Sequence, residues 1–569
     1  MTKAGVVTSP LTESFVDPIP ITTPVICLRR RPNNRLFEVK HGSVAISQHL
    51  RSEFMMMGNS MLSASWVLEV FPVIVVVALL FRVIQYRLFH PLRSVPGPWL
   101  NSISELPAAF NLVRGDQHTY YRSLHEKYGP VVRVSPNELG FISVEAREEI
   151  YGLRKGGMNM EKSAIFLGAV GSIDGQTGVS LALNKEHARQ RRALGYLFTN
   201  SALQNLEGLL QEHIQKFVAI LGSRAAENQA VDVSAWYTYL AFDLMGDLCF
   251  AEPFGCLDQG SATEWSTSVI NVFVAATWTQ AIRRISGVDT WLESVMTWLL
   301  VPVKFAAWRK IHLNNSREKT LSRLADPDRD HTDFIHRILN NESKKSLSHT
   351  EVILNMALFI SAGTDTTATA LTGWTYFVST QPNVYKRLVR EVRSAFTLEE
   401  EIKWEKVKEL GYLEATLHEA LRLFPPSPAS QQRVVPPGGA TIDGYFVPAG
   451  MTVAVSPWSA THSRLNFHEP DMFLPERWLG DDERFSKDHL NASLPFGTGP
   501  RVCIGKNLAY MEMRLIAAHL LWNFDMELDQ GEFEEKNAAW GLDGRMKPMK
   551  VFHSMTKPQL WVQFKPVHQ

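Results

Sequence analysis

Long apolar runs, amphipathic stretches and short alternating segments follow one another along this chain. The longest apolar run lies near the N-terminus: residues 61–83 are mostly apolar, and Glu69 is the only charged residue before Arg82. An apolar run of about twenty residues is long enough to cross a bilayer as a helix. We therefore predict a transmembrane anchor at residues 61–83, in preference to a buried core helix.

The segments on either side of this run differ from it in composition. Residues 1–60 show no clear periodicity, which is typical of a disordered leader or of an over-extended gene start. Residues 84–100 contain three prolines, which stiffen the chain and oppose a helix, and they predict a short spacer. More arginines closely follow the apolar run than precede it, which favours a cytosolic C-terminal body.

Residues 101–569 show no second linker, internal repeat or low-complexity run, so we predict one large domain. Its pattern is mainly that of amphipathic or buried helices. Two stretches differ. Residues 131–144 are strand-like around a Pro-Asn turn, and residues 440–455 predict two short strands around a Pro-Ala-Gly turn.

One predicted helix is unusually long and apolar. It spans about residues 348–381, with a capping box from Ser348 to Glu351 and an end before Pro382. Its centre reads AGTDTT, and glycine, aspartate and threonine are unfavourable inside a buried helix. Two interpretations remain: a solvent-facing polar stripe, or a kink at which hydroxyls and a carboxylate face a cavity.

Composition and charge exclude several classes of function. The 58 basic and 58 acidic residues balance, so nothing favours a nucleic acid as partner. The four cysteines form no CxxC pair, which argues against a zinc site and against a disulfide framework. Cys249 and Cys256 lie in an apolar stretch and are expected to be buried, and a reducing compartment is favoured.

Cys503 lies in a different setting, the glycine-rich segment PFGTGPRVCIG at residues 495–505. It could be a structural thiol, a catalytic nucleophile or a metal ligand. The segment offers no base for a nucleophile, and a structural thiol needs no surrounding glycines. Glycines do let backbone amides approach a metal-bound thiolate, and Arg501 is placed to bind an anionic group of a cofactor.

These residues resemble the cytochrome P450 family. The segment from Phe496 to Gly505 matches the haem loop FxxGxRxCxG at every fixed position, and AGTDTT resembles the oxygen-activating helix of the family. LHEALRLFPP contains the ExxR pattern, and PERW resembles the PERF-like meander. The order and spacing agree across roughly residues 90–565. The resemblance implies the P450 fold, mainly α with a small β region, as one haem domain behind the anchor.

The resemblance also implies roles for single residues around haem b. Cys503 resembles the axial thiolate ligand of the iron, whose electron donation favours O–O cleavage. Phe496 would pack on the haem near the sulfur. Donors to the haem propionates are expected at Arg501, Arg433, His187 and Arg191, with His187 in place of the usual tryptophan. A buried ionic network that braces the haem-binding side is expected from Glu419, Arg422 and Arg477.

Asp365 and Thr366 are the predicted catalytic residues. Oxygen activation requires protons at the distal oxygen, and an acid beside an alcohol can relay them through water. The alternative is that Asp365 only caps a kink. Gly363 is expected to thin the helix and leave room for O2.

The chain shows no flavin or nicotinamide site, so electrons are expected from a separate NADPH-cytochrome reductase. A basic face of Arg189, Arg192 and Lys506 is one candidate docking surface, and an ordinary solvated surface is the alternative. Fungal microsomal members of the family that act in secondary metabolism are the most similar, although Ala251 replaces their usual glycine.

The expected function is a single-pass monooxygenase of the endoplasmic reticulum membrane that inserts one oxygen atom into a lipophilic small molecule. Its catalytic domain would face the cytosol. Three alternatives remain: an isomerase or dehydratase that does not use O2, a detoxifying monooxygenase, and a haem protein that carries electrons or senses a ligand.

Overall fold

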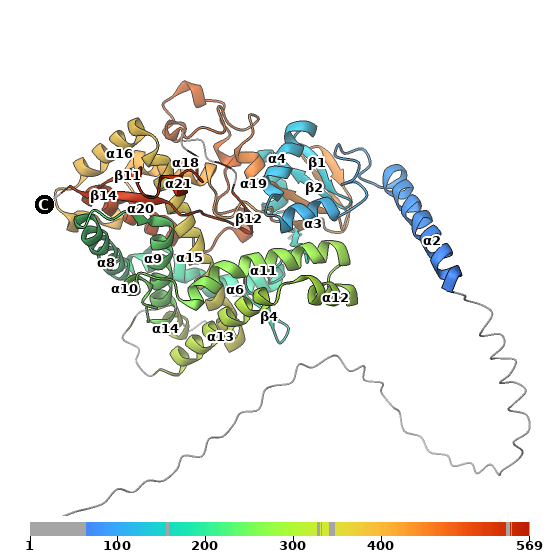
Figure 1. The fold of residues 1–569 in the computed structure, drawn as a ribbon, viewed down its shortest axis with the longest axis horizontal. Coiled ribbons are helices and arrows are strands. Elements are labelled where there is room, and N and C mark those ends of the chain that lie inside the picture. Colours follow the sequence, from blue (N-terminus) through green and yellow to red (C-terminus); the bar gives the residue numbers. More distant parts are fainter. Residues whose placement is uncertain are drawn as a thin grey trace, which may run out of the picture. The chain divides into compact units, whose positions relative to one another are not determined.

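The computed structural model describes residues 64–154, 159–326, 331, 333–340, 347–541, 547 and 549–567 (Figure 1). The predicted leader, the first three residues of the predicted anchor and Cys27 lie outside these residues. The chain divides into two compact units, residues 1–77 and residues 78–569.

Helix α2 (Ala64–Ile84) coincides with the predicted anchor and continues into a π-helical turn, Gln85–Phe89. The segment Val70–Phe89 is long and apolar enough to cross a membrane. Its mean hydropathy is 1.9, and none of it is buried. The following residues are not a free spacer: Leu92 and Val95 are buried, and the N–H of Arg133 donates to the Pro96 carbonyl at 2.8 Å.

Residues 78–569 are mainly helical, in agreement with the predicted fold class. The principal helices are α3 (Leu106–Val113), α4 (Gln117–Tyr128), α5 (Val144–Tyr151), α6 (Asn184–Leu194), α8 (Glu207–Ala226), α9 (Val233–Phe250), α11 (Glu264–Ser286), α12 (Trp291–Leu300), α13 (Val303–Ala325), α14 (Phe334–Asn340), α15 (His349–Ser379), α16 (Pro382–Ala395), α18 (Gly411–Leu423) and α20 (Lys506–Asn523). Shorter helices are α7 (Asn200–Gln204), α10 (Cys256–Gln259), α17 (Trp404–Val407), α19 (Pro457–Thr461) and α21 (Glu534–Asn537).

The largest sheet has the order β1-β2-β10-β7-β3. Its strands are β1 (Val131–Ser135), β2 (Glu138–Phe141), β3 (Glu161–Lys162), β7 (Arg433–Val434) and β10 (Thr452–Val455). β1 and β2 form the predicted pair around Pro136-Asn137, and β10 joins β2 in parallel. Because β3 pairs with β7, Lys162 lies directly opposite Arg433. This edge of the sheet therefore carries two basic residues side by side.

The prediction of two strands in residues 440–455 was incomplete. The structure has three: β8 (Ala440–Ile442), β9 (Tyr445–Val447) and β10. β8 and β9 form a hairpin at Asp443-Gly444, where φ is 48° and 78°. Asp-Gly is a favourable sequence for a two-residue hairpin turn with positive φ at both positions, so the signal was present in the sequence.

The remaining strands lie mostly near the C-terminus, where only helices were predicted. A three-stranded sheet has the order β11-β14-β6, and two short hairpins are β4-β5 and β12-β13. Their bounds are β4 (Ser172–Ile173), β5 (Gln176–Thr177), β6 (Val231–Asp232), β11 (Phe524–Leu528), β12 (Val551–Phe552), β13 (Ser554–Met555) and β14 (Trp561–Pro566). The strands β6, β11 and β14 pair with partners far away in the sequence, which local pattern does not reveal. The strands of the hairpins β4-β5 and β12-β13 have only two residues each, too few to show an alternating pattern.

Helix α15 runs for 31 residues through the core, and both bonds of the predicted capping box at Ser348 are present. The central residues Thr364, Asp365 and Thr367 are all buried. The interpretation of a solvent-facing stripe is therefore wrong. The expectation for Gly363 is also wrong: it faces α9, where a Cβ would lie 2.4 Å from the Met245 sulfur. That glycine allows two helices to pack closely instead of leaving room for O2.

Candidate active site

The loop before α20 presents Cys503 through backbone geometry that only glycine accommodates easily. Gly499 has φ 69°, and a Cβ there would lie 2.0 Å from the Tyr151 carbonyl oxygen. The N–H of Cys503 donates to the Phe496 carbonyl at 2.8 Å, which closes the loop. The partly buried Phe496 ring packs on Tyr510 of α20, with 4.9 Å between ring centroids. The loop is thus tightly held, and Cys503 is an exposed residue of it.

Opposing influences act on the Cys503 thiol. Loss of hydration raises its pKa, whereas the N–H of Gly505 and the positive charges of Arg191 and Lys506 act in the opposite direction. Cys249 and Cys256 are buried as predicted, and burial raises the pKa of both thiols. Among the described cysteines, Cys503 alone is exposed and also lies near basic side chains.

Arg501 and Arg433 come together as predicted. The Nη2 of Arg501 donates to the Ala182 carbonyl at 2.7 Å, but its Nε and Nη1 are buried with no partner among the described residues. Burial and the charge of Arg433 lower the pKa of Arg501 to about 10. Arg433 is itself buried and lies over the Tyr151 ring at 5.0 Å.

Lys162 is a third cation in this cluster, and the sequence analysis missed it. Its Nζ donates to the Ser180 carbonyl at 2.8 Å and lies 4.5 Å from the centre of the Phe166 ring. Burial, Arg433 and Arg501 together lower its pKa well below the ordinary value. No sequence motif marks this lysine, because only the pairing of β3 with β7 brings it to Arg433.

His187 and Arg191 lie one turn apart on α6, as predicted. His187 is buried, so the alternative of a surface His-Arg pair is wrong for it. Burial, and then the charges of Arg501, Arg191 and Lys162, lower the pKa of His187 to about 4. The imidazole is therefore neutral near pH 7. Arg191 is partly exposed, and its charge interacts with the Cys503 thiol.

These basic groups have little acidic compensation from the described chain. Glu161 is 3.6 Å from Arg501, but its side chain is 40% exposed. Buried cations without counter-charges are costly unless a ligand supplies the missing charge. A flat cofactor with two carboxylates and a metal beside Cys503 fits this donor set. The unpartnered Nε and Nη1 of Arg501 are free to bind one of those carboxylates.

The predicted network of Glu419, Arg422 and Arg477 is present and completely buried. Arg422 binds Glu419 through Nε and Nη2, both at 2.8 Å, and Arg477 binds it through Nε at 2.9 Å. The Glu419 carboxylate also accepts from the indole of Trp478 at 2.8 Å. The remaining Arg422 donors bind carbonyls of Thr461, Pro470 and Met472. A buried charge network in which the charged groups are hydrogen-bonded in this way is rigid.

Asp365 has two partners that the sequence did not indicate. Lys557 binds its carboxylate at 2.7 Å, and the Ser554 hydroxyl donates to it. Both partners come from the C-terminal segment that begins with hairpin β12-β13. Thr366, next in the chain, is partly accessible and donates to the Ala362 carbonyl at 2.6 Å. The acid is therefore held by a salt bridge, and the alcohol is the more accessible of the pair.

A second buried carboxyl lies near this pair, on α20. Thr367 donates to Glu512 at 2.9 Å, and no described cation forms an ion pair with that acid. Burial raises the pKa of Glu512 to about 8, so it is mostly protonated at pH 7. Its signal in the sequence was a lone acid in the apolar stretch AYMEMRLIAAHLLW.

A family model for cytochrome P450 matches residues 96–552. The chain belongs to the cytochrome P450 family. It is 60% identical over 497 residues to the cytochrome P450 monooxygenase aba2 of Botryotinia fuckeliana, covering 87% of this chain and 94% of that protein. It is 52% identical to ABA2 of Pyricularia oryzae, covering 86% and 94%. With the monooxygenase astA of Talaromyces wortmannii the identity is 37%, covering 84% and 93%.

Membership of this family makes the protein an oxidoreductase and a P450 monooxygenase. The family implies a haem held by a cysteine thiolate, and the cation-rich surroundings of Cys503 fit such a group. These relatives do not favour the alternative functions, a non-oxidative isomerase or an electron carrier.

Proposed function

We propose that this P450 is a membrane-anchored monooxygenase that inserts one oxygen atom from O2 into a lipophilic small molecule during secondary-metabolite biosynthesis. The observation that carries the proposal is a cluster of basic groups with almost no acid, formed by Arg501, Arg433, Lys162 and His187, in the neighbourhood of the loop that carries Cys503. Cys503 would ligate the haem iron, and Phe496 would pack beside the sulfur. The propionates would be bound by Arg433, Arg501, His187, Arg191 and Lys162.

The haem, when bound, supplies the reductive activation of O2, and this chain supplies binding, shape and protons. Thr366 is accessible enough to hold a water by its hydroxyl, which currently donates to Ala362. Asp365 lies next to it and is held by Lys557 and Ser554. To pass a proton toward Thr366, the Asp365 carboxylate must exchange one of these partners for water. Lys557 is thus a positioning residue for the catalytic acid.

Electrons would come from a separate NADPH-cytochrome reductase. Of the three basic residues proposed for its docking, Arg192 and Lys506 are exposed. Arg189 instead binds Glu186 at 2.8 Å and also Glu351, so its charge is largely compensated. We therefore assign the docking surface to Arg192 and Lys506, beside the loop that carries Cys503.

The location would be the endoplasmic reticulum membrane, with the catalytic domain in the cytosol. Besides the apolar segment Val70–Phe89, a second feature supports membrane contact. Helix α12 buries none of its residues, and its Trp291 and Trp298 are exposed. Leu106 and Phe110 of α3 are also exposed, and both helices pack on α11. Exposed tryptophan, leucine and phenylalanine side chains of this kind suit a membrane interface.

The test begins with the purified full-length holoenzyme. A thiolate-type band in the reduced carbon monoxide spectrum, lost in Cys503→Ser, is expected if Cys503 ligates the iron. Turnover should then require both the reductase and NADPH. Mass spectrometry of the source organism with and without the gene should reveal a compound that accumulates in the deletion and lacks one oxygen relative to the lost product. Turnover without reductase would contradict the proposal and favour an isomerase.

A further inference from the structure

A tyrosine, a histidine and a glutamate form a line of polar contacts beside the loop that carries Cys503. The Tyr510 hydroxyl of α20 lies 3.3 Å from Nδ1 of His418 on α18. On the opposite side of the imidazole ring, Nε2 of His418 lies 2.9 Å from the carboxylate of Glu414, one turn earlier on α18. A phenol, an imidazole and a carboxylate therefore follow one another within hydrogen-bond distance.

The charges around Glu414 determine the protonation of His418. Nε and Nη2 of Arg514 donate to the two oxygens of Glu414, at 2.6 and 2.5 Å. Burial opposes ionisation of Glu414, but hydrogen bonds from His418 and Arg514 outweigh it and lower the pKa of this acid to about 2. A carboxylate only accepts hydrogen bonds, so Nε2 of His418 carries a proton. Because Arg514 already balances the charge of Glu414, the imidazole is neutral and its Nδ1 accepts from Tyr510.

Tyr510 keeps its proton unless a base accepts it. Burial, and then the negative charge of Glu414, raise the pKa of the Tyr510 hydroxyl above its ordinary value. The phenol is therefore neutral at pH 7. One-electron oxidation turns a phenol into a strong acid, so the reaction is favourable only where a base takes up the proton. Nδ1 of His418 is such a base, within hydrogen-bond distance of the hydroxyl.

The Tyr510 ring also contacts the loop of Cys503. The N–H of Cys503 donates to the Phe496 carbonyl at 2.8 Å. The Phe496 ring packs on Tyr510 with 4.9 Å between centroids and an angle of 44° between the ring planes. Tyr510 is thus linked to the cysteine loop through one aromatic ring in direct contact.

The other end of the line lies closer to solvent. The His418 ring stacks on the partly buried Trp478 at 4.9 Å, and the His418 side chain is 30% exposed. Tyr510 itself is buried. A small molecule in solution can therefore reach the imidazole, although it cannot reach the phenol directly.

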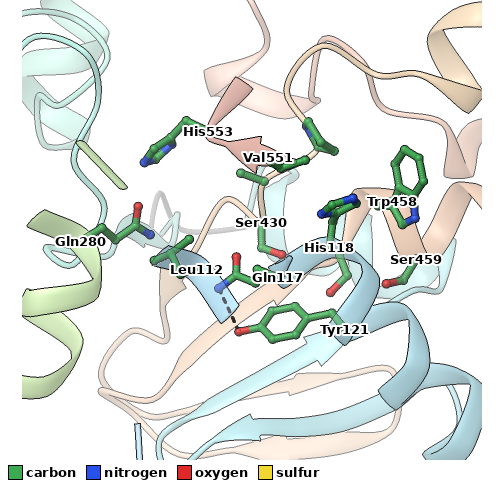
Figure 2. A pocket seen from close by; sticks show the side chains of 13 residues that line it. Leu112, Gln117, His118, Tyr121, Gln280, Ser430, Trp458, Ser459, Val551 and His553 are labelled. Carbon is green, nitrogen blue, oxygen red and sulfur yellow. Dashed lines mark hydrogen bonds between the residues drawn. The ribbon is translucent and has the colours of Figure 1, made fainter. Parts of the chain in front are cut away.

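A second buried tyrosine has a different setting. Figure 2 shows Tyr121 in a pocket between α4, α11 and the hairpin β12-β13, which is also lined by His118 and His553. The Tyr121 hydroxyl accepts from the side-chain amide of Gln117 at 3.4 Å, the bond marked in the figure. An amide cannot take up a proton from a phenol. Burial of a tyrosine near histidines is thus not sufficient for the arrangement found at Tyr510.

We propose that Tyr510 is a redox-active tyrosine that protects this P450 when its haem centre is oxidised and no substrate is present. Tyr510 gives one electron to the oxidised haem centre, and its O–H bond breaks as Nδ1 of His418 takes the proton. The tyrosine becomes a neutral phenoxyl radical, and the imidazolium is stabilised by Glu414. A small one-electron donor in solution, such as ascorbate or a thiol, then reduces the radical, and His418 returns the proton. Each cycle removes one oxidising equivalent.

The oxidising power comes from the reaction of the monooxygenase with O2. The inference rests on the proposed ligation of the haem iron by Cys503, because Tyr510 contacts the loop of that cysteine through Phe496. It does not depend on the identity of the substrate.

The test is electron paramagnetic resonance on the purified full-length holoenzyme, freeze-quenched after mixing with hydrogen peroxide in the absence of substrate. The natural protein should give a tyrosyl radical signal, and Tyr510→Phe should lose most of it. Incorporation of 3-fluorotyrosine in place of Tyr510 keeps the ring and its hydroxyl and should change the hyperfine pattern of the signal. His418→Gln should lower the radical yield, because an amide cannot take up the proton.

Tyr121→Phe is the matched control, since it also removes a buried hydroxyl with one hydrogen-bond partner and should keep the signal. A second readout is the loss of haem absorbance during NADPH-driven turnover with reductase and without substrate. Tyr510→Phe should lose haem faster than the natural protein, and Tyr121→Phe should not. Added ascorbate should slow the loss in the natural protein more than in Tyr510→Phe.

The proposal is overturned if peroxide produces no tyrosyl radical in the natural protein, or if the signal persists in Tyr510→Phe. Equal loss of the signal in Tyr121→Phe, or equal rates of haem loss in Tyr510→Phe and the natural protein, would also contradict it. An enzyme with a thiolate-type carbon monoxide spectrum and reductase-dependent turnover, but without this radical, retains the monooxygenase function and loses the protective one. An enzyme that lacks this spectrum loses the proposed function itself.

Discussion

Two buried ionic clusters of this P450 differ in how their charges are satisfied. In the network around Glu419, Arg422 and Arg477 both donate to the carboxylate. Their remaining guanidinium donors bind backbone carbonyls or Asp488. In the cluster around Arg501, basic groups gather with almost no acid, and two of its guanidinium nitrogens have no described partner. Folding alone completes the first cluster. The second needs a ligand to supply its negative charge.

The comparison separates residues that stabilise the folded protein from residues whose charge is balanced only when a ligand binds. Removing a buried charge that has its counter-charge within the protein should cause a large loss of stability, because the partner is left buried and uncompensated. Removing a buried charge that has no partner within the protein should reduce binding or activity with little loss of stability.

The largest effect is expected for Glu419→Ala. Removing this acid leaves Arg422 buried without a counter-charge and leaves Arg477 with Asp488 as its only acid, at a cost of about 3–5 kcal/mol in the free energy of unfolding. Thermal unfolding and the yield of thiolate-type carbon monoxide band per protein would measure the loss. The control is Glu527→Ala, which breaks an exposed pair with Lys565 and should cost about 0–1 kcal/mol. Equal losses of unfolding free energy in Glu419→Ala and Glu527→Ala would contradict the view that the buried network stabilises the fold more than an exposed ion pair does.

Asp365→Asn should reduce product formation about 100- to 10,000-fold. The reason is that an amide cannot take up and release the proton that Asp365 would relay. The substitution should also lower the free energy of unfolding, because Lys557 is left nearly buried without its counter-charge, so activity is compared per haem-loaded protein. Product formed per NADPH consumed is the measurement, because a merely structural change would lower both together. Lys557→Gln removes the salt bridge and should change the same ratio less. Unchanged coupling in Asp365→Asn would remove this acid from the relay.

Glu512→Gln should alter the dependence of stability on pH. Burial raises the pKa of Glu512 in the folded protein to about 8, above its ordinary value of 4.5. Folding therefore takes up a proton between these values, and the natural protein loses stability as pH rises through that window. The glutamine variant avoids this loss, so its thermal stability should gain roughly 1–3 kcal/mol relative to the natural protein between pH 6 and pH 8. A parallel pH profile for both proteins would mean that Glu512 is ionised when folded.

The smallest effect is expected at the end of α9. Ala251 has φ 59°, a left-handed conformation that glycine adopts without a steric penalty. Ala251→Gly should therefore stabilise the protein by about 1 kcal/mol, measured by thermal unfolding. Ala219→Gly, at an exposed position inside α8, should have the opposite sign, with a loss of about 0.5–1 kcal/mol. Destabilisation by both variants would refute the interpretation of Ala251.

Features that depend on neighbouring residues could be predicted from the sequence. The capping box at Ser348, the strand pair around Pro136 and the glycine-rich segment before Cys503 are each encoded within a few residues. The grouping of Arg501 with Arg433 required more than local pattern, and resemblance to the family supplied it. The roles of the residues around Cys503 remain predictions, and the positions of these residues in the structure are compatible with the predicted roles.

Sequence by itself determined the helical fold class, the apolar N-terminal segment and the family, because apolar periodicity and contiguous motifs are local properties of a chain. Tertiary structure decided which groups are satisfied. Lys557 meets Asp365 across 192 residues, and Thr367 meets Glu512 across 145. Lys162 reaches Arg433 through strand pairing. Whether a buried charge has a partner depends on atoms that only folding brings together, so the unpartnered guanidinium nitrogens of Arg501 could be seen only in the folded protein.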